Sequence, residues 1–307
     1  MRKKKINILI ADPITATLVS YFPKSKFNVN VSTCISNEDI LKLYSGTDCL
    51  IIRSTRKIDR KFLSAFRGNL IATCSRGFDH IDIKCAETEN IKIIYSLGAN
   101  SVSAAEHTFA MILNIYKKIH ISDSLVRNGK FTDLSFERNE LEGKKIGIVG
   151  LGQVGRRVAN FSKAFGMEIF FNDTDKNVVK SNPQLRHKTL KWILRNCDIV
   201  TVHIPLNKKN YRFFTGEKLS LMRRKSIFIN TSRGAVVDEN ALIKLLQKRK
   251  IKYAGLDVFL NEPHINNIFF NIDNVLLTNH TAGKTKESSE KTASDIYKQV
   301  TNFYIIN

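Results

Sequence analysis

The amino-acid sequence predicts an α/β fold of two domains, each a parallel sheet flanked by helices, with an active-site cleft between them. Three observations lead to this prediction. Short apolar runs alternate with helix-like segments along the whole chain. A glycine-rich turn follows one of these runs and precedes a helix-like segment. The length of 307 residues is sufficient for two domains with cores of their own.

The first part of the chain predicts a sheet of short buried strands. The expected strands are residues 7–10, 49–52, 69–73 and 91–95, and the expected helices are 37–44 and 60–66. A long helix is expected to begin near Ser103 and to run through Lys118. This helix is apolar around much of its circumference, so we expect it to be buried, to link the domains and to form part of a homodimer interface.

The second part of the chain predicts a complete parallel sheet. Its expected strands are residues 146–149, 168–171, 199–204, 226–230, 253–257 and 275–278. A final helix is expected over 284–303. We therefore expect one discontinuous domain, residues 1–102 plus 284–307, and a second domain, residues 103–283, inserted into it.

The glycine-rich turn Gly150-Leu-Gly152-Gln-Val-Gly155 is the strongest motif of the chain. Its first glycine allows a tight turn, the second lets the backbone approach a pyrophosphate, and the third lets helix and strand pack closely. Amide groups at the start of the following helix then face the anion. Asp173, at the end of the next strand, is spaced to bind the adenosine ribose hydroxyls and to repel a 2′-phosphate. The motif predicts a Rossmann-like domain that binds NAD in preference to NADP.

The composition argues against several other classes of protein. Hydrophobic residues make up 43% and charged residues 25% of the chain, as in ordinary globular proteins, and no apolar run is long enough to cross a membrane. The five cysteines are scattered and form no CxxC pair, so we expect reduced thiols, a cytoplasmic protein and no metal site. The net charge of +21 is spread along the chain without aromatic interleaving. It therefore predicts a small anionic substrate and not a nucleic-acid partner.

Three polar side chains follow successive strands of the second domain. Arg233, Glu262 and His280 each come after the carboxyl end of a predicted strand. Ligands of open parallel sheets bind outside those ends, so the three side chains should converge near the glycine-rich turn. Histidine titrates near neutral pH and suits a general base, a carboxylate beside it would orient the ring, and arginine binds a substrate carboxylate through two donors.

These motifs resemble those of the D-isomer-specific 2-hydroxy acid dehydrogenases over nearly the whole chain. The resemblance rests on GLGQVG, CDIVTVHIPL, NTSRGAVVDENAL, GLDVFLNEP and NHTAG, in the family's order and at similar spacings. It implies that residues 103–283 bind NAD and that the discontinuous domain binds the substrate. Within the family the chain looks most like the phosphoglycerate dehydrogenases and erythronate-4-phosphate dehydrogenases. No counterpart of the extra C-terminal regulatory domain of longer phosphoglycerate dehydrogenases is expected in it.

The resemblance also implies roles for single residues. Arg233, Glu262 and His280 match the catalytic set. Residues that match the cofactor site are Gly150, Gly152, Gln153, Val154, Gly155, Asp173, Ile204, Pro205, Thr231, Ser232, Asp257 (at the position that binds the nicotinamide carboxamide) and Gly283. Residues expected to bind substrate are Arg53, Ser54, Ser75, Arg76, Gly77, Asn100 and Arg233. His107, on the long helix, is expected to make a contact between domains.

Three departures from the family pattern bear on the substrate. Asn279 replaces the family's proline before the histidine, Thr174 replaces a proline after the ribose-binding Asp, and Arg76 stands in a loop that is usually rich in glycine. Arg53 and Arg76 favour a phosphorylated acid, with 3-phosphoglycerate and a place in serine biosynthesis as the leading hypothesis. The alternatives are 4-phosphoerythronate, hydroxypyruvate or glyoxylate as substrate, and a nucleotide-sensing protein like the eukaryotic corepressors that resemble this family.

Overall fold

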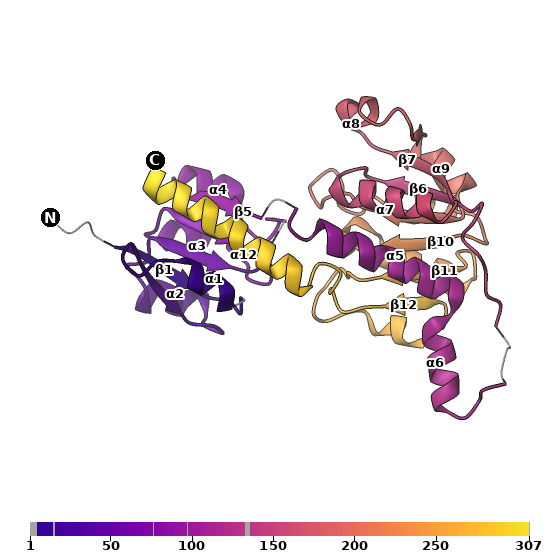
Figure 1. The fold of residues 1–307 in the computed structure, drawn as a ribbon, viewed down its shortest axis with the longest axis horizontal. Helices are drawn as coiled ribbons and strands as arrows, with labels where there is room; N and C mark the ends of the chain where they lie inside the picture. The colour runs from indigo at the N-terminus through magenta and orange to yellow at the C-terminus, as the bar shows by residue number, and fades with distance from the viewer. Residues whose placement is uncertain (1–4, 15, 76, 97, 133–135, 307) are drawn as a thin grey trace. The chain divides into compact units, whose positions relative to one another are not determined.

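The computed structural model describes residues 5–14, 16–75, 77–96, 98–132 and 136–306. It confirms the predicted α/β class, with two parallel sheets flanked by helices (Figure 1). The chain divides into two compact units. Unit 1 consists of Met1–Asn100 and Lys284–Asn307, and unit 2 of Ser101–Gly283. Unit 2 is thus inserted between the two segments of unit 1.

Unit 1 contains a five-stranded parallel sheet in the order β2-β1-β3-β4-β5. Its elements are β1 (Ile6–Ile10), α1 (Ala16–Tyr21), β2 (Phe27–Val31), α2 (Asn37–Leu43), β3 (Cys49–Ile52), α3 (Arg60–Ala65), β4 (Leu70–Thr73), α4 (Ile83–Thr88), β5 (Lys92–Tyr95) and α12 (Lys286–Thr301). The edge strand β2 was not predicted. Its sequence alternates asparagine with apolar residues, and of its five residues only Phe27 is buried, so it lacks the continuous apolar run of the inner strands.

Alternate side chains of the unit 1 strands enter two separate cores. Leu9 of β1 packs with the buried residues of α2, α3 and α4, whereas its neighbour Ile8 faces the opposite side. There α1 and the C-terminal helix α12 cover the sheet, and Ala293, Ile296 and Val300 of α12 are at most 1% exposed. Helix α12 therefore completes a core whose other members come from the first hundred residues.

Unit 2 contains a seven-stranded parallel sheet in the order β12-β11-β10-β9-β6-β7-β8. Its elements are α5 (Ser101–Lys117), α6 (Ile119–Arg127), β6 (Lys145–Val149), α7 (Gln153–Ala164), β7 (Glu168–Asn172), α8 (Lys176–Lys180), β8 (Arg186–His187), α9 (Leu190–Asn196), β9 (Ile199–Val202), α10 (Gly216–Ser220), β10 (Ile227–Asn230), α11 (Glu239–Gln247), β11 (Tyr253–Leu256) and β12 (Val275–Leu277). Helices α5 and α7 cover one face, and α9, α10 and α11 cover the other. The active-site candidates follow the carboxyl ends of these strands.

Two details of unit 2 correct the predictions from sequence. The two-residue edge strand β8 was not expected, because both of its residues are polar and exposed. The long helix begins at Ser101 and ends at Lys117, since Lys118 has a left-handed backbone with φ of 57° and separates α5 from α6. Among the described residues, no helix combines the length and apolar character that crossing a bilayer requires.

Candidate active site

The glycine-rich turn between β6 and α7 has no room for a side chain at Gly150 or Gly155. Gly150 has φ of 94°, and a Cβ there would lie 2.8 Å from the carbonyl oxygen of His203. A Cβ on Gly155 would collide with the carbonyl oxygen of Gly150. Helix α7 begins at Gln153 after Gly152, which has no side chain with which to cap it. The first amides of α7 therefore have no side-chain cap, whereas side chains of Thr189 and Asp238 cap α9 and α11.

Asp173 connects the end of β7 to this turn. Its Oδ2 accepts the backbone N–H of Leu151 at 2.8 Å, and its Oδ1 accepts the N–H of Asp175 at 2.9 Å. The carboxylate is therefore held beside the glycine-rich turn. Each oxygen retains acceptor capacity, which is what binding a ribose hydroxyl requires.

His280 and Glu262 form a close pair at the ends of β12 and β11. Nδ1 of His280 lies 2.5 Å from Oε2 of Glu262, and Oε1 of Glu262 accepts the N–H of Phe259 at 2.9 Å. The side chains are 38% and 32% exposed, so a ligand can reach them. Burial alone would raise the pKa of Glu262, but the hydrogen bond from His280, the Phe259 amide and the charges of His280 and Arg233 together lower it. Glu262 is therefore ionised at neutral pH.

Arg233 follows β10 in a loop built around Asn230. The buried Asn230 side chain accepts the N–H of Ser232 at 3.0 Å and donates to the carbonyl oxygen of Arg233 at 3.0 Å. The Arg233 guanidinium donates to the carbonyl oxygen of Ser232 at 2.8 Å, and its charge helps to lower the pKa of Glu262. Within unit 2 the structure thus brings Arg233, Glu262 and His280 into one electrostatic cluster.

Asp257 anchors the loop that carries His280. Its side chain is fully buried, and it accepts the Thr278 hydroxyl at 2.6 Å and the N–H groups of Thr281 and Ala282 at 2.9 and 3.0 Å. His280 itself has φ of 53°, a left-handed conformation that non-glycine residues seldom adopt. The contacts of Asp257 on either side of His280 hold it there. The contact of Asp257 with a nicotinamide carboxamide stays a prediction.

Further predicted cofactor residues lie in the loops after β9 and β10. Thr231 exchanges a hydrogen bond of 2.7 Å with Thr108 of α5, and Ile204 packs against the core beneath β9. Pro205 is exposed. His107 of α5 lies 3.1 Å from the Thr278 hydroxyl and 3.5 Å from Oδ1 of Asp257, both contacts within unit 2. The sequence offered no signal for the supporting roles of Asn230 and Thr108.

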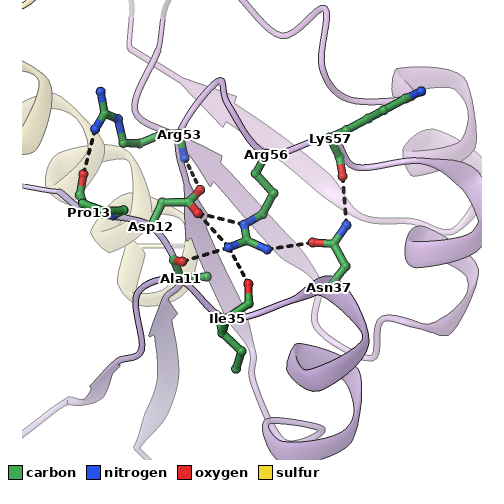
Figure 2. A network of polar contacts seen from close by, with 8 residues as sticks. All are labelled: Ala11, Asp12, Pro13, Ile35, Asn37, Arg53, Arg56 and Lys57. Atoms are coloured by element: carbon green, nitrogen blue, oxygen red, sulfur yellow. Dashed lines mark hydrogen bonds and ion pairs between the residues drawn. The ribbon is translucent and has the colours of Figure 1, made fainter. Parts of the chain in front are cut away.

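The predicted substrate residue Arg53 follows β3 in unit 1, beside a polar network (Figure 2). Its backbone N–H donates to Oδ2 of Asp12 at 2.8 Å, and its guanidinium donates to the carbonyl oxygen of Pro13 at 3.2 Å. Asp12 is paired with Arg56 at 2.7 Å, and the two side chains are 9% and 11% exposed. Arg56 also binds Asn37 at 2.8 Å. Asp12 and Arg56 therefore fix the loop from which Arg53 projects, and sequence reasoning missed both.

Other predicted substrate residues of unit 1 lie in loops after β3, β4 and β5. The Ser75 hydroxyl donates to the carbonyl oxygen of Gly77 at 2.7 Å and lies 2.8 Å from the Thr73 hydroxyl. Ser54 is exposed and Asn100 is half-buried. Arg76 lies outside the described residues. Burial raises the pKa of the neighbouring Cys74 to about 12, although Arg53 lowers it, so this thiol is protonated at neutral pH.

Comparison with known proteins identifies the family. The family model for the D-isomer specific 2-hydroxyacid dehydrogenase, NAD binding domain, matches residues 109–282. D-3-phosphoglycerate dehydrogenase of Methanocaldococcus jannaschii is 30% identical over 96% of this chain and 57% of its own length. Glyoxylate reductase of Thermococcus litoralis is 34% identical over 86% of this chain and 82% of its own length. This chain thus spans little more than half of the phosphoglycerate dehydrogenase.

A solved structure agrees with this assignment. The D-lactate dehydrogenase from Aquifex aeolicus, complexed with NAD and lactic acid, superposes with a TM-score of 0.84 and 27% identity, covering 97% of this chain and 95% of that one. The likeness extends over both units and not only over the part that the family model matches. The chain therefore belongs to the D-isomer specific 2-hydroxyacid dehydrogenase family, and residues 109–282 form its NAD-binding domain.

Proposed function

We propose that the chain is an NAD-dependent oxidoreductase that transfers a hydride between NAD and a small, phosphorylated D-2-hydroxy acid. The observation that carries the proposal is the His280–Glu262 pair, with Nδ1 and Oε2 2.5 Å apart. The Arg233 charge acts on the same carboxylate. A base, its orienting carboxylate and an anion-binding arginine are the groups that oxidation of a 2-hydroxy acid requires.

The glycine-rich turn fits the dinucleotide. The pyrophosphate would lie against Gly152, Gln153 and Val154, where the absence of side-chain caps leaves the amides of α7 open. Asp173 would accept hydrogen bonds from the adenosine ribose. NAD, when bound, supplies the acceptor of the hydride.

The side chains of unit 2 would handle the proton and the carboxylate. If Nδ1–H of His280 donates its hydrogen bond to the Glu262 carboxylate, then Nε2 carries the free lone pair of a neutral imidazole. Nε2 would remove the hydroxyl proton of the substrate as its C–H hydride leaves and the carbonyl forms. Glu262 would then stabilise the imidazolium, and Arg233 would bind the substrate carboxylate and polarise the new carbonyl.

We favour 3-phosphoglycerate as the acid because Arg53 offers a guanidinium at a position shared with phosphoglycerate dehydrogenases, and a relative with that name matches 96% of the chain. The relatives also support a second candidate. The second candidate is reduction of glyoxylate or hydroxypyruvate. Its support is the similarity to glyoxylate reductases such as that of Thermococcus litoralis, of whose length this chain covers 82%. 4-Phosphoerythronate is the third acid to be tested.

A substrate screen tests the proposal. The purified chain is assayed for NADH formation with 3-phosphoglycerate, 4-phosphoerythronate, glycerate and D-lactate, and for NADH consumption with glyoxylate and hydroxypyruvate. We expect turnover with a phosphorylated D-acid and a kcat/KM at least tenfold above that for its unphosphorylated analogue. Saturable NADH binding without turnover of any acid would contradict the enzyme proposal and favour a nucleotide-sensing protein.

We also propose a homodimer in which α5 and the adjoining α6 form the interface. Apolar side chains on and just beyond α6 support this, because Ile119, Val126 and Phe131 are 58%, 55% and 80% exposed. Light scattering after size-exclusion chromatography tests the proposed homodimer.

The five free cysteines support a reducing, cytoplasmic location.

A further inference from the structure

A second carboxylate contacts the loop that carries Glu262. Glu239 is the first residue of α11, the helix that follows β10, and it is buried. Its Oε1 accepts the backbone N–H of Leu260 at 2.5 Å. Glu262 accepts the N–H of Phe259 at 2.9 Å, so two carboxylates bind consecutive amides of one short stretch of backbone. We call residues 259–260 the shared segment.

The loop after β10 also packs against the shared segment. Gly234 directly follows Arg233, and a Cβ at Gly234 would collide with the carbonyl carbon of Phe259. The two backbones can approach this closely only because glycine has no side chain. The shared segment thus contacts the loop that carries Arg233 and is bound by Glu262. Its position therefore bears on two of the three catalytic candidates.

Glu239 is not the N-cap of its helix. Asp238 has that role, since its side chain accepts the N–H of Ala241 at 3.1 Å. Burial raises the pKa of Glu239, the hydrogen bond from Leu260 lowers it, and the charge of Glu262 raises it again. Burying a carboxylate costs free energy, which the Leu260 amide offsets in part. The contacts of Glu239 therefore indicate a role in the loop after β11 and not in capping α11.

We propose that Glu239 is a positioning residue, which ties the shared segment to α11 and so holds Glu262 in place against His280. The proposal rests on the oxidoreductase function proposed above. Without Glu239 the Leu260 amide loses its acceptor, and the backbone that orients Glu262 can shift. A displacement of about 1 Å at a reacting group can cost about a hundredfold in rate. Glu239 acts through the reach of its acceptor oxygen and not through its charge.

Two conservative variants separate reach from charge. Glu239→Gln keeps the length and an oxygen acceptor but removes the charge, whereas Glu239→Asp keeps the charge on a side chain one methylene shorter. We expect kcat within about threefold of the wild type for Glu239→Gln, and at least about tenfold lower for Glu239→Asp and Glu239→Ala. kcat is expressed per NADH-binding site, because loss of folded protein would reduce turnover and binding together.

The matched controls lie at the neighbouring residue. Asp238→Asn and Asp238→Ala make the same chemical changes at the start of α11, at a carboxylate that binds the Ala241 amide within its own helix. Both controls should keep kcat within about threefold of the wild type. A loss of kcat in Asp238→Ala equal to that in Glu239→Ala would show that any support of α11 suffices, and would overturn the specific role of Glu239.

A measurement on the histidine ring makes the test independent of turnover. In protein labelled with ¹⁵N-histidine, the signals of His280 are assigned by their loss in His280→Asn, and their shifts report which ring nitrogen carries the proton. The bond to Glu262 should keep the proton on Nδ1 in the wild type and in Glu239→Gln. In Glu239→Ala and Glu239→Asp, the shifts should move toward those of Glu262→Ala, in which the acceptor is absent.

The outcomes distinguish this proposal from the proposed function. Unchanged His280 shifts in Glu239→Ala and Glu239→Asp would overturn the positioning role, whether or not the chain oxidises an acid. An active Glu239→Asp beside an inactive Glu239→Gln would also overturn it, because charge would then be what Glu239 supplies. Shifts that move as expected in a chain without turnover would support the hold on Glu262 and contradict only the oxidoreductase function.

Discussion

Oε2 of Glu262 lies 2.5 Å from Nδ1 of His280, while Oε1 of the same carboxylate accepts the backbone N–H of Phe259. The Glu262 carboxylate thus connects the imidazole of His280 to the backbone at Phe259 and orients the ring. Asp257 accepts the N–H of Thr281 and so holds the backbone next to His280. A base that is positioned before substrate arrives loses less entropy during the reaction.

His280→Asn should abolish proton transfer without disturbing the dinucleotide site. We expect kcat to fall by about 10²–10⁴-fold, since that is the range that general base catalysis contributes. NADH binding, followed by fluorescence, should stay within twofold of the wild type. A variant that keeps a tenth of the wild-type kcat would show that another group is the base.

Glu262→Gln should change both turnover and the pH dependence of stability. The folded pKa of Glu262 is lowered, so its stabilising contribution is present above its unfolded pKa, about 4.3, and is lost as pH falls through the lower folded value. Urea unfolding should therefore show the largest stability gap between wild type and variant at pH 6–7 and a smaller gap below pH 4. A gap that does not change with pH would contradict the shift. kcat should fall as well, because glutamine cannot stabilise an imidazolium.

The dinucleotide preference can be tested at Asp173 with two variants. Asp173→Asn retains an acceptor for the N–H of Leu151 but removes the charge, so it should narrow the preference for NAD over NADP while the turn persists. Asp173→Ala also removes the support of the turn and should weaken both cofactors further. Dissociation constants for NADH and NADPH measure this. A wild type that prefers NADPH would refute the ribose assignment.

Arg53→Ala should discriminate between phosphorylated and unphosphorylated acids. We expect a loss in kcat/KM of about 2–3 kcal/mol for 3-phosphoglycerate, roughly 30- to 150-fold, and a much smaller loss for glycerate. The network of Asp12 and Arg56 uses the backbone and not the guanidinium of Arg53, so the fold should persist. Equal losses on both acids would remove the phosphate role and leave the dehydrogenase assignment intact.

Asp257→Ala should destabilise unit 2. The substitution leaves the N–H groups of Thr281 and Ala282 and the Thr278 hydroxyl without their acceptor in a buried place. We expect a loss of about 2–4 kcal/mol in the free energy of unfolding. Thr278→Val removes only one of these bonds and is the matched control, for which a loss of about 1 kcal/mol is expected. Equal stabilities for the wild type and Asp257→Ala would contradict the anchoring role.

The fold could be predicted where local sequence and tertiary structure agree. The inner strands are continuous apolar runs because both faces of each sheet are covered, and Gly150 and Gly155 of the turn stand where a Cβ would collide with backbone. Prediction failed at β2 and β8. These two segments are strands because they pair with β1 and β7, and their composition alone does not indicate a strand. It also failed at Lys118, where a left-handed residue ends α5 without a glycine or proline to signal it.

The candidate site shows the same division. Three catalytic candidates could be proposed from the sequence, namely Arg233, Glu262 and His280. Each follows a strand, and in a parallel sheet the carboxyl ends of the strands lie on the same side. The residues that support the site could not be predicted from the sequence. Arg56 binds Asp12 across 44 residues of sequence. Such contacts depend on the register of the folded sheets, which no local pattern records.

The covering of the unit 1 sheet by α12 has a consequence for the order of folding. Strands β1 to β5 leave the ribosome first, yet the helix that buries Leu18 and Phe22 arrives only after residues 101–283 have been made. Unit 2 is one continuous stretch of chain and can complete its core at once, whereas the earlier segment must wait with an uncovered apolar face. We therefore expect the core of unit 2 to form during synthesis before the core that α12 completes in unit 1.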